Sequence, residues 1–196
     1  MRWLCGCVLV LTSCAGSATD DRALTTTTTT SIASPPATAD PAAGSTAPTV
    51  TENPDAITPE GYELVAARAT KPDGSVCQLC LWLAESQDQR SNGLMFVTDL
   101  GPADGMAFVY PEPHSGAFWM KNTVIPLSIA FYDAGGAFLG GFDMAPCTSD
   151  PCLQYPTPDG FTIAIETTQG ELRELGLEAG SVFELLATPC PPAPSP

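Results

Sequence analysis

From about residue 60 onward, hydrophobic and polar residues alternate along short segments, whereas the residues before it show no such alternation. An alternation with a period of two predicts β-strands that bury one face. Turns that contain glycine or proline separate the segments from one another. The predicted strands are residues 62–69, 76–83, 106–110, 116–120, 126–133, 136–144, 161–167 and 181–187.

Two segments depart from the alternation and predict short helices, residues 85–94 and residues 170–175. In the first, Ser86 is placed to act as N-cap, and Gly93 should end the helix in a left-handed conformation. Residues 133–136, Asp-Ala-Gly-Gly, predict a hairpin turn because glycine adopts the positive φ that such turns need. Many short strands with few helices predict a mainly β domain, either a sandwich or a partly closed barrel with one or two short helices.

The chain begins with Arg2 and a short apolar run over residues 3–11. A bilayer span needs about 20 apolar residues, so the run is too short to cross a membrane and is typical of a secretory signal. Residues 11–15, LTSCA, resemble a bacterial lipobox, in which Cys14 is lipidated and becomes the mature N-terminus. We therefore expect a lipoprotein signal peptide over residues 1–14 and an extracytoplasmic protein anchored to the bacterial membrane through Cys14. An ordinary signal cut nearby, which would give a secreted protein, is the alternative.

Residues 15–60 are rich in Thr, Ala, Pro and Ser and contain no apolar periodicity. Such a segment cannot bury enough apolar surface to offset the entropy of ordering, so it predicts a disordered linker. We expect the β-rich domain over residues 61–188 and a proline-rich tail over residues 189–196.

The chain is strongly acidic, with 22 Asp and Glu against 7 Lys and Arg and a net charge of −15. This balance argues against binding to nucleic acid, which favours basic surfaces through counterion release. It also argues against attraction to anionic lipid headgroups. An acidic surface that keeps the domain soluble is the simplest explanation.

Five of the eight cysteines follow the linker, which indicates an oxidising compartment. Cys147 and Cys152 enclose a turn around Asp150-Pro151 and predict a disulfide. Cys190 can pair with either Cys77 or Cys80. A thioredoxin-like redox role is disfavoured because no βαβ pattern surrounds residues 77–80.

Several short motifs stand in a specific order and spacing along the domain. They are residues 90–95 (RSNGLM), 104–108 (DGMAF), 118–123 (FWMKNT), 125–127 (IPL), Pro146 and Cys147 with Cys152 and Tyr155, and 165–166 (IE). With these motifs the chain resembles the domain of unknown function 192 family, from about Val76 to Phe183. The resemblance implies a compact, jelly-roll-like, mainly β domain, often behind a secretion signal, with no established activity. The family usually has Asp after its Pro-Leu, where this chain has Ser128.

The segment FWMKNT supplies the candidate binding residues. The period of two along a strand places Phe118 and Met120 toward the core and Trp119 and Lys121 on the opposite face. An indole with the ammonium of Lys121 and the amide of Asn122 beside it is suited to a sugar or another small polar ligand. The alternative is that the methylene stem of Lys121 only covers the indole.

Arg90, in the first predicted helix, is the fourth candidate. Buried arginines are usually paired, which favours an internal ion pair with Asp104 or Glu166 that fixes the helix on the sheet. In the alternative, Arg90 supports the ligand site beside Trp119.

These residues favour a non-catalytic binding or envelope-associated module for a small polar ligand or glycan, without catalytic residues, metal or cofactor. One alternative is a hydrolase of cell-envelope carbohydrate that uses paired carboxylates. A lesser alternative is a copper-binding protein, because thioethers are soft ligands for Cu(I). Its candidate ligands, which lack the close M-x-x-M spacing of dedicated sites, are Met95, Met106, Met120 and Met144.

Overall fold

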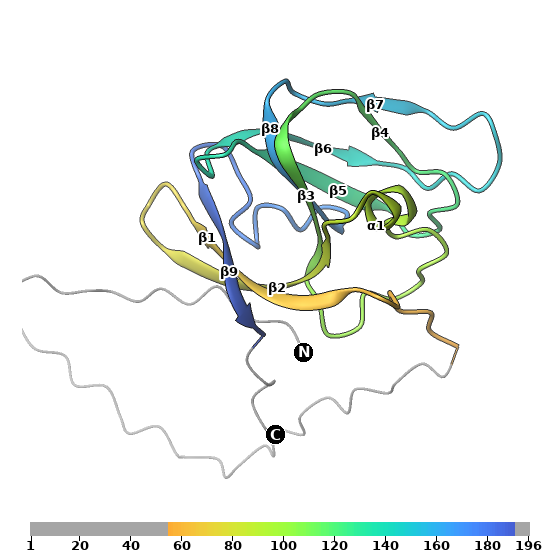
Figure 1. Ribbon diagram of the computed structural model, residues 1–196, viewed down its shortest axis with the longest axis horizontal. Coiled ribbons are helices and arrows are strands. Elements are labelled where there is room, and N and C mark those ends of the chain that lie inside the picture. Colours follow the sequence, from red (N-terminus) through yellow and green to blue (C-terminus); the bar gives the residue numbers. More distant parts are fainter. Residues whose placement is uncertain (1–54, 191–196) are drawn as a thin grey trace, which may run out of the picture. The chain divides into compact units, whose positions relative to one another are not determined.

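The computed structural model describes residues 55–190, apart from the side chain of Ala187, and this part of the chain is mainly β (Figure 1). Its elements are β1 (Glu63–Thr70), β2 (Val76–Ala84), α1 (Gln87–Asn92), β3 (Gly105–His114), β4 (Ala117–Trp119), β5 (Leu127–Tyr132), β6 (Phe138–Met144), β7 (Gln154–Pro156), β8 (Phe161–Thr168) and β9 (Val182–Pro189). No helix within these residues is long and apolar enough to span a membrane. The predicted signal peptide with Cys14, the linker up to residue 54 and the tail beyond residue 190 lie outside the described residues.

Seven strands form one mixed sheet in the order β6-β5-β8-β3-β2-β1-β9, and β4 pairs with β7 in a separate two-stranded sheet. Within the large sheet β2 and β3 are parallel, whereas the other neighbours are antiparallel. The sheet curls until its edges meet at one isolated bridge between Ala137 and Val182, without closing into a continuous barrel. The predicted mainly β fold is therefore confirmed.

Two hydrophobic clusters pack against the two faces of the sheet. The strand β5, between β6 and β8, is buried along its whole length and contributes to both. Leu127, Ile129 and Phe131 belong to the first cluster, which also contains Met120 beside the small sheet. Ala130 and Tyr132 belong to the second cluster, on the opposite face of the sheet. This separation follows from the period of two along a strand.

The helix α1 begins where the sequence predicts. Ser86 is the N-cap, and it forms a capping box with Gln89 in which each side chain bonds to the backbone of the other. Gly93 ends the helix with φ 47° and ψ −130°, which is a positive φ but not the left-handed helical conformation that we expected. A Cβ atom at Gly93 would lie 3.1 Å from the ring of Phe108, so close packing of α1 on β3 also requires glycine here.

The predicted hairpin turn between β5 and β6 is confirmed. The carboxylate of Asp133 accepts hydrogen bonds from the backbone N–H groups of Gly135 (2.9 Å) and Ala137 (2.8 Å). Gly136 has φ 77°, which supplies the positive φ expected of this turn.

The predicted helix over residues 170–175 is wrong, because this segment forms only turns. Its end nevertheless has the hydrogen bonds of a Schellman motif. The N–H of Leu177 donates to the carbonyl of Leu172 (2.8 Å), and the N–H of Gly176 donates to that of Arg173 (3.2 Å). The segment therefore ends at Gly176 as a helix does, but it is too short to propagate a helix.

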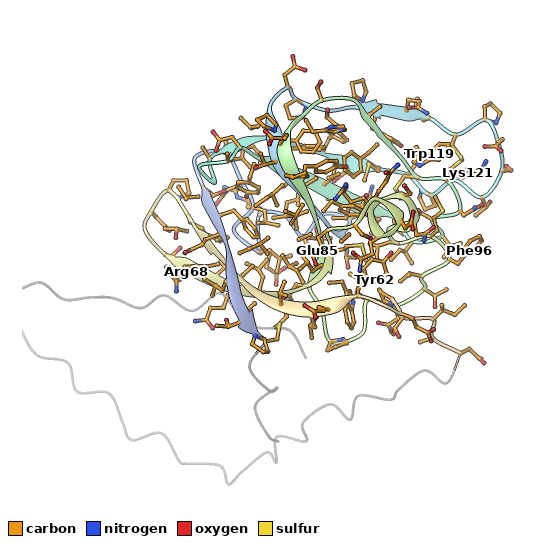
Figure 2. All side chains as sticks on the ribbon, viewed as in Figure 1. Tyr62, Arg68, Glu85, Phe96, Trp119 and Lys121 are labelled. Atoms are coloured by element: carbon orange, nitrogen blue, oxygen red, sulfur yellow. A yellow bond between two sulfur atoms is a disulfide. The ribbon has the colours of Figure 1, made fainter. Side chains whose placement is uncertain are left out.

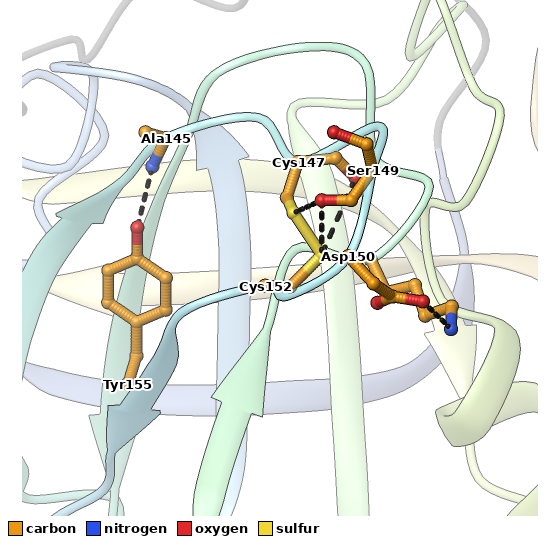
Figure 3. Close-up of a disulfide and its surroundings, with 7 residues drawn as sticks. Ala145, Cys147, Ser149, Asp150, Cys152 and Tyr155 are labelled. Carbon is orange, nitrogen blue, oxygen red and sulfur yellow. Dashed lines mark hydrogen bonds and ion pairs between the residues drawn. A yellow bond between two sulfur atoms is a disulfide. The ribbon is translucent and has the colours of Figure 1, made fainter.

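The predicted disulfide between Cys147 and Cys152 is present, and a second disulfide joins Cys190 to one of its two candidate partners. Cys147 is bonded to Cys152, with an S–S distance of 2.06 Å, and closes the loop shown in Figure 3. Cys190 is bonded to Cys80, with an S–S distance of 2.34 Å. Of the two alternatives, Cys80 is therefore the partner of Cys190, and Cys77 is not. The second bond joins the end of β9 to β2, on the other side of β1.

Candidate ligand-binding site

The strand β4 and the turn after it separate their side chains as the sequence predicts. Met120 is buried in the first cluster, and the ring of Phe118 packs edge-on against Phe108 at 5.5 Å. Trp119 between them is 44% exposed. The N–H of Thr123 then donates to the carbonyl of Met120 (2.9 Å), which closes a bend after β4.

Lys121 lies beside Trp119, with its Nζ 5.5 Å from the centre of the indole ring. Figure 2 shows both side chains at the end of the domain that carries α1. The same ammonium forms an ion pair of 2.9 Å with Asp150 in the disulfide loop, drawn in Figure 3. Such an exposed pair contributes about 1 kcal/mol or less, so its main effect is to place the loop next to Trp119 and to neutralise the Lys121 charge.

Asn122 holds two loops together through its backbone. Its N–H donates to the carbonyl of Cys147 (2.8 Å), and its carbonyl accepts from the N–H of Phe96 (2.8 Å). Asn122 has φ 57°, a left-handed conformation that Asn tolerates better than most residues. The residue therefore has a structural role that the sequence did not reveal.

The expected ion pair of Arg90 is wrong. The guanidinium of Arg90 donates to the backbone carbonyls of Glu85 and Val109 (2.8 Å for Val109), and it lies 4.8 Å from the ring centre of Tyr110. The carboxylate of Asp104 instead accepts from the N–H of Cys80 (2.8 Å). Arg90 therefore fixes α1 on β3 through backbone carbonyls and a cation–π contact, and not through a carboxylate.

A small hollow of about 40 Å³ lies between α1, β3 and β4. Arg90 and Trp119 both line it, so the structure brings together two of the four candidate residues. Lys121 and Asn122 are not part of the lining. The lining of the hollow also includes Leu94, Phe108, Phe118, Thr123 and Glu166.

Glu166 is the feature of the hollow that the sequence did not single out as a binding residue. It lies on β8 between Met106 of β3 and Ile129 of β5, and both neighbours belong to the first cluster. Directly opposed residues share a face of the sheet, so the carboxyl group points into this apolar layer. Glu166 is only 5% exposed, and no residue in the range 55–190 forms a hydrogen bond or ion pair with its carboxyl group.

Burial raises the pKa of Glu166 to about 8, because a charged carboxylate is poorly solvated in apolar surroundings. The charge of Glu166 also affects the pKa values of two phenols close to the hollow. Burial, and then the charge of Glu166, raise the pKa of Tyr62. Burial also raises the pKa of Tyr110, where the charges of Arg90 and Glu166 act in opposite directions. At neutral pH the hollow therefore contains a protonated carboxylic acid.

Thr123 is a second polar side chain in the same lining. It is 5% exposed, and within the described part of the chain its hydroxyl group has no hydrogen-bond partner. No enclosed side-chain nitrogen or oxygen among the described residues lacks a hydrogen-bond partner, so the unbonded hydroxyl oxygen of Thr123 is accessible to solvent. Glu166 and Thr123 therefore give the hollow two oxygen-bearing groups available for a ligand.

Ser128, at the position where the family usually has Asp, faces away from this site. It is fully buried on the face of β5 that also carries Ala130. Its hydroxyl donates to Asp143 and accepts from the N–H of Gly170 (2.8 Å). The departure from the family pattern is therefore accommodated inside the fold by these two hydrogen bonds.

The methionines proposed as copper ligands have a different role. Met106, Met120 and Met144 are fully buried members of the first cluster, where Met commonly fills irregular gaps. Among residues 55–190 no group of three or more His, Cys, Asp or Glu side chains is arranged to hold a metal ion. The copper interpretation therefore gains no support.

Comparison with known proteins agrees with this fold. No curated protein matches the chain. Two similar solved structures are a protein of unknown function from Novosphingobium aromaticivorans and a Sinorhizobium meliloti protein named as a candidate transcription regulator. The first is 28% identical, covers 71% of this chain and 94% of its own, and has a TM-score of 0.55. The second is 27% identical, covers 63% and 95%, and has a TM-score of 0.54.

The family model called DUF192, described as an uncharacterized ACR, matches residues 68–185, which is more than half of the chain. The match extends from β1 to β9 and includes α1 and the hollow. This chain belongs to the DUF192 family.

Proposed function

We propose that the domain is a non-catalytic binding module of the cell envelope, and that it holds a small polar ligand or a glycan terminus in the hollow between α1 and β4. The observation that carries this proposal is the carboxyl group of Glu166 in the lining: the residue is 5% exposed, no group within residues 55–190 bonds to its oxygens, and these oxygens remain accessible to solvent. Buried ionisable groups without a partner are costly, and they concentrate at functional sites. Trp119, 44% exposed at the same hollow, offers an aromatic face to a ligand.

The hydrolase alternative receives less support. Glycoside hydrolysis by this route needs two carboxyl groups on either side of the bond that is cleaved. Glu166, with its raised pKa, has the character of a general acid, but it is the only carboxyl group in the lining of the hollow as described by the structure. No second carboxylate is therefore placed to act as base or nucleophile.

The role named for the Sinorhizobium meliloti neighbour is not carried over to this chain. Binding to DNA draws on Lys and Arg contacts with phosphates. This chain carries 7 such residues against 22 acidic ones, and two of the seven, Arg90 and Lys121, are engaged within the domain. Its charge therefore opposes a regulator that contacts DNA directly.

The second part of the proposal concerns location: an extracytoplasmic protein anchored to the membrane through a lipid on Cys14. The motif around Cys14 supports the anchor, and the two disulfides support an oxidising compartment. Acyl chains contribute about 0.8 kcal/mol per buried methylene, so two or more chains anchor a protein stably.

Replacing Cys14 by Ser should release the protein from the membrane into the medium when it is made in a bacterial host, because the acceptor for the lipid is lost. Mass spectrometry of the wild-type N-terminal peptide should show a diacylglyceryl group. The control is Cys7→Ser, which lies inside the predicted signal and should leave anchoring intact. Unchanged membrane retention of Cys14→Ser would contradict the anchor.

Replacing Trp119 by Ala should weaken ligand binding about five- to thirtyfold, which corresponds to about 1 to 2 kcal/mol, because an aromatic wall of the hollow is lost. Its effect on stability should be small, since the side chain is 44% exposed. Met120→Ala, one residue away on the opposite face, is the matched control. It should cost about 2 to 5 kcal/mol of unfolding free energy and leave the hollow in place.

The measurement is an NMR titration of the full chain carrying Cys14→Ser with N-acetylglucosamine, a short peptide and n-butylammonium. We expect at least one of these probes to shift the indole signal of Trp119 together with backbone signals of residues 90–95 and 123. If every probe that binds shifts signals elsewhere only, or if none binds, the proposed site is wrong.

A further inference from the structure

The lining of the hollow points to a particular class of ligand, and this inference rests on the proposed function. We infer that the hollow binds the ammonium group of an aliphatic amine, with Glu166 as its counter-ion, Thr123 as a further acceptor, and aromatic rings around it. The aliphatic chain of the amine would leave the hollow past Trp119.

The hydrogen-bonding groups fit an ammonium group better than a neutral ligand. An alkylammonium ion carries three N–H donors and no acceptor. Glu166 and Thr123 are both 5% exposed, both line the hollow, and within residues 55–190 neither side chain oxygen is bonded to a protein donor. A charged donor to a carboxylate is about twice as strong as a bond between neutral groups, so an amine gains most from these acceptors.

The aromatic walls favour a cation for an independent reason. The rings of Phe108 and Phe118 meet edge-on at 5.5 Å, and both residues line the hollow together with Trp119. A cation near the face of an aromatic ring gains about 0.5 to 2 kcal/mol, and more when water is excluded. Neutral hydroxyl groups of a sugar gain no comparable electrostatic energy from these rings.

The size of the hollow excludes the bulk of a sugar. The hollow of about 40 Å³ is small beside the roughly 300 to 1,000 Å³ of pockets that enclose a whole drug-sized ligand, so it suits an end group of a ligand. An ammonium group with its first methylene fits this space. A whole pyranose ring with its hydroxyl groups is larger, so a glycan would have to present an amino group to enter.

Among residues 55–190, no cationic side chain forms an ion pair with Glu166. Arg90 is held by the carbonyls of Glu85 and Val109, and Lys121 is paired with Asp150. Neither of them neutralises Glu166. The carboxyl group therefore stays available for a cation that comes from outside the domain.

Binding of an amine should release one proton from the protein at neutral pH. Glu166 is protonated in the free protein because its pKa is about 8, whereas an ammonium ligand stabilises the carboxylate. The other titratable groups that face it are Arg90 from α1, Tyr110 from β3 and Tyr62 before β1. The phenols have raised pKa values and stay neutral between pH 6 and 8. Affinity should therefore rise as pH rises toward 8.

The test is isothermal titration calorimetry of the full chain carrying Cys14→Ser, with n-butylammonium as probe and n-butanol as its neutral counterpart. We expect saturable binding of the amine, at least tenfold weaker binding of the alcohol, and about tenfold tighter amine binding at pH 7 than at pH 6. Titrations in buffers with different ionisation enthalpies should show close to one proton released per amine bound.

Two variants measure the contributions of Glu166 and Thr123 to amine binding, and a third variant is the control. Glu166→Gln should weaken amine binding at pH 7.5 by at least tenfold and abolish both the proton release and the pH dependence. Thr123→Val should weaken binding severalfold and leave the pH dependence unchanged. His114→Gln is the control, because His114 is the only histidine of the chain and lies opposite Phe161, at the other end of β8 from Glu166.

Equal binding of amine and alcohol, an affinity that does not depend on pH, or an unchanged affinity of Glu166→Gln would each overturn the amine inference. Different results would contradict the proposed binding function. If N-acetylglucosamine or the peptide binds at Trp119 while the amine does not, the hollow remains a binding site and only the ligand class is wrong. If no probe moves the Trp119 signal, both are wrong.

Discussion

The variant Glu166→Gln is expected to be more stable than the wild type at pH 7 and equally stable at pH 4. Burial raises the pKa of Glu166 to about 8 in the folded state, against an ordinary value of 4.5. The folded state therefore binds this proton more tightly than the unfolded state does. Its stabilising effect is complete below about pH 4.5 and is lost as the pH rises through 8.

The size of the expected stability change follows from the difference between the folded-state and the ordinary pKa of Glu166. Each pKa unit corresponds to about 1.4 kcal/mol, so wild-type stability should fall by about 3 kcal/mol between pH 4.5 and pH 7 through this group alone. The glutamine amide has almost the same shape and does not titrate, so the variant lacks this loss.

Urea unfolding at pH 4, 5.5, 7 and 8 measures the difference directly. The control is Glu112→Gln on the exposed end of β3, which should change stability by no more than about 0.5 kcal/mol at any of these pH values. A Glu166→Gln variant that is less stable than the wild type at pH 7 would mean that the native carboxyl group is ionised and held by a partner.

Removing the disulfide between Cys80 and Cys190 should destabilise the domain more than removing the one between Cys147 and Cys152. The first pair is separated by 110 residues and the second by 5. In the chain-entropy model, the long loop is worth about 4 to 5 kcal/mol and the short one about 2 kcal/mol. The long-range bond also joins the last strand, at one edge of the sheet, to β2.

The double variants Cys80→Ser/Cys190→Ser and Cys147→Ser/Cys152→Ser provide a matched comparison, since each loses one bond and gains two hydroxyl groups. Their unfolding free energies should differ by about 2 to 3 kcal/mol in the expected order. If the short-loop variant proves the less stable, the loop that carries Asp150 contributes far more to stability than its length suggests.

The strands and their faces could be predicted from the sequence because their signal is local. The alternation Phe118, Trp119, Met120 is enough to separate a packed ring, an exposed indole and a buried thioether. The same holds for Ser86, whose cap with Gln89 depends on residues three apart. The three-residue strand β7 has no such pattern, and it forms because it pairs with β4.

The character of the hollow could not be predicted, because it depends on contacts between distant segments. A glutamate that follows Ile165 in a strand suggests a solvent-facing position. Glu166 is buried instead, because its face of β8 packs into the first cluster, in the layer beneath α1 and β4. The sequence marked Glu166 only through its place in a family motif and as a candidate partner of Arg90. Likewise the partner of Lys121 lies 29 residues away, and Arg90 is held by carbonyls that carry no sequence signal.

Glu166 should be an uncharged acid at neutral pH in the lining of a ligand site. Its side-chain carboxyl carbon can be titrated by ¹³C NMR, with the signal assigned by comparison with Glu166→Gln. We expect a midpoint near pH 8 in the free protein, displaced to lower pH when n-butylammonium is added. A midpoint near 4.5 in the free protein would show a solvated carboxylate, and Glu166 would then be charged at neutral pH.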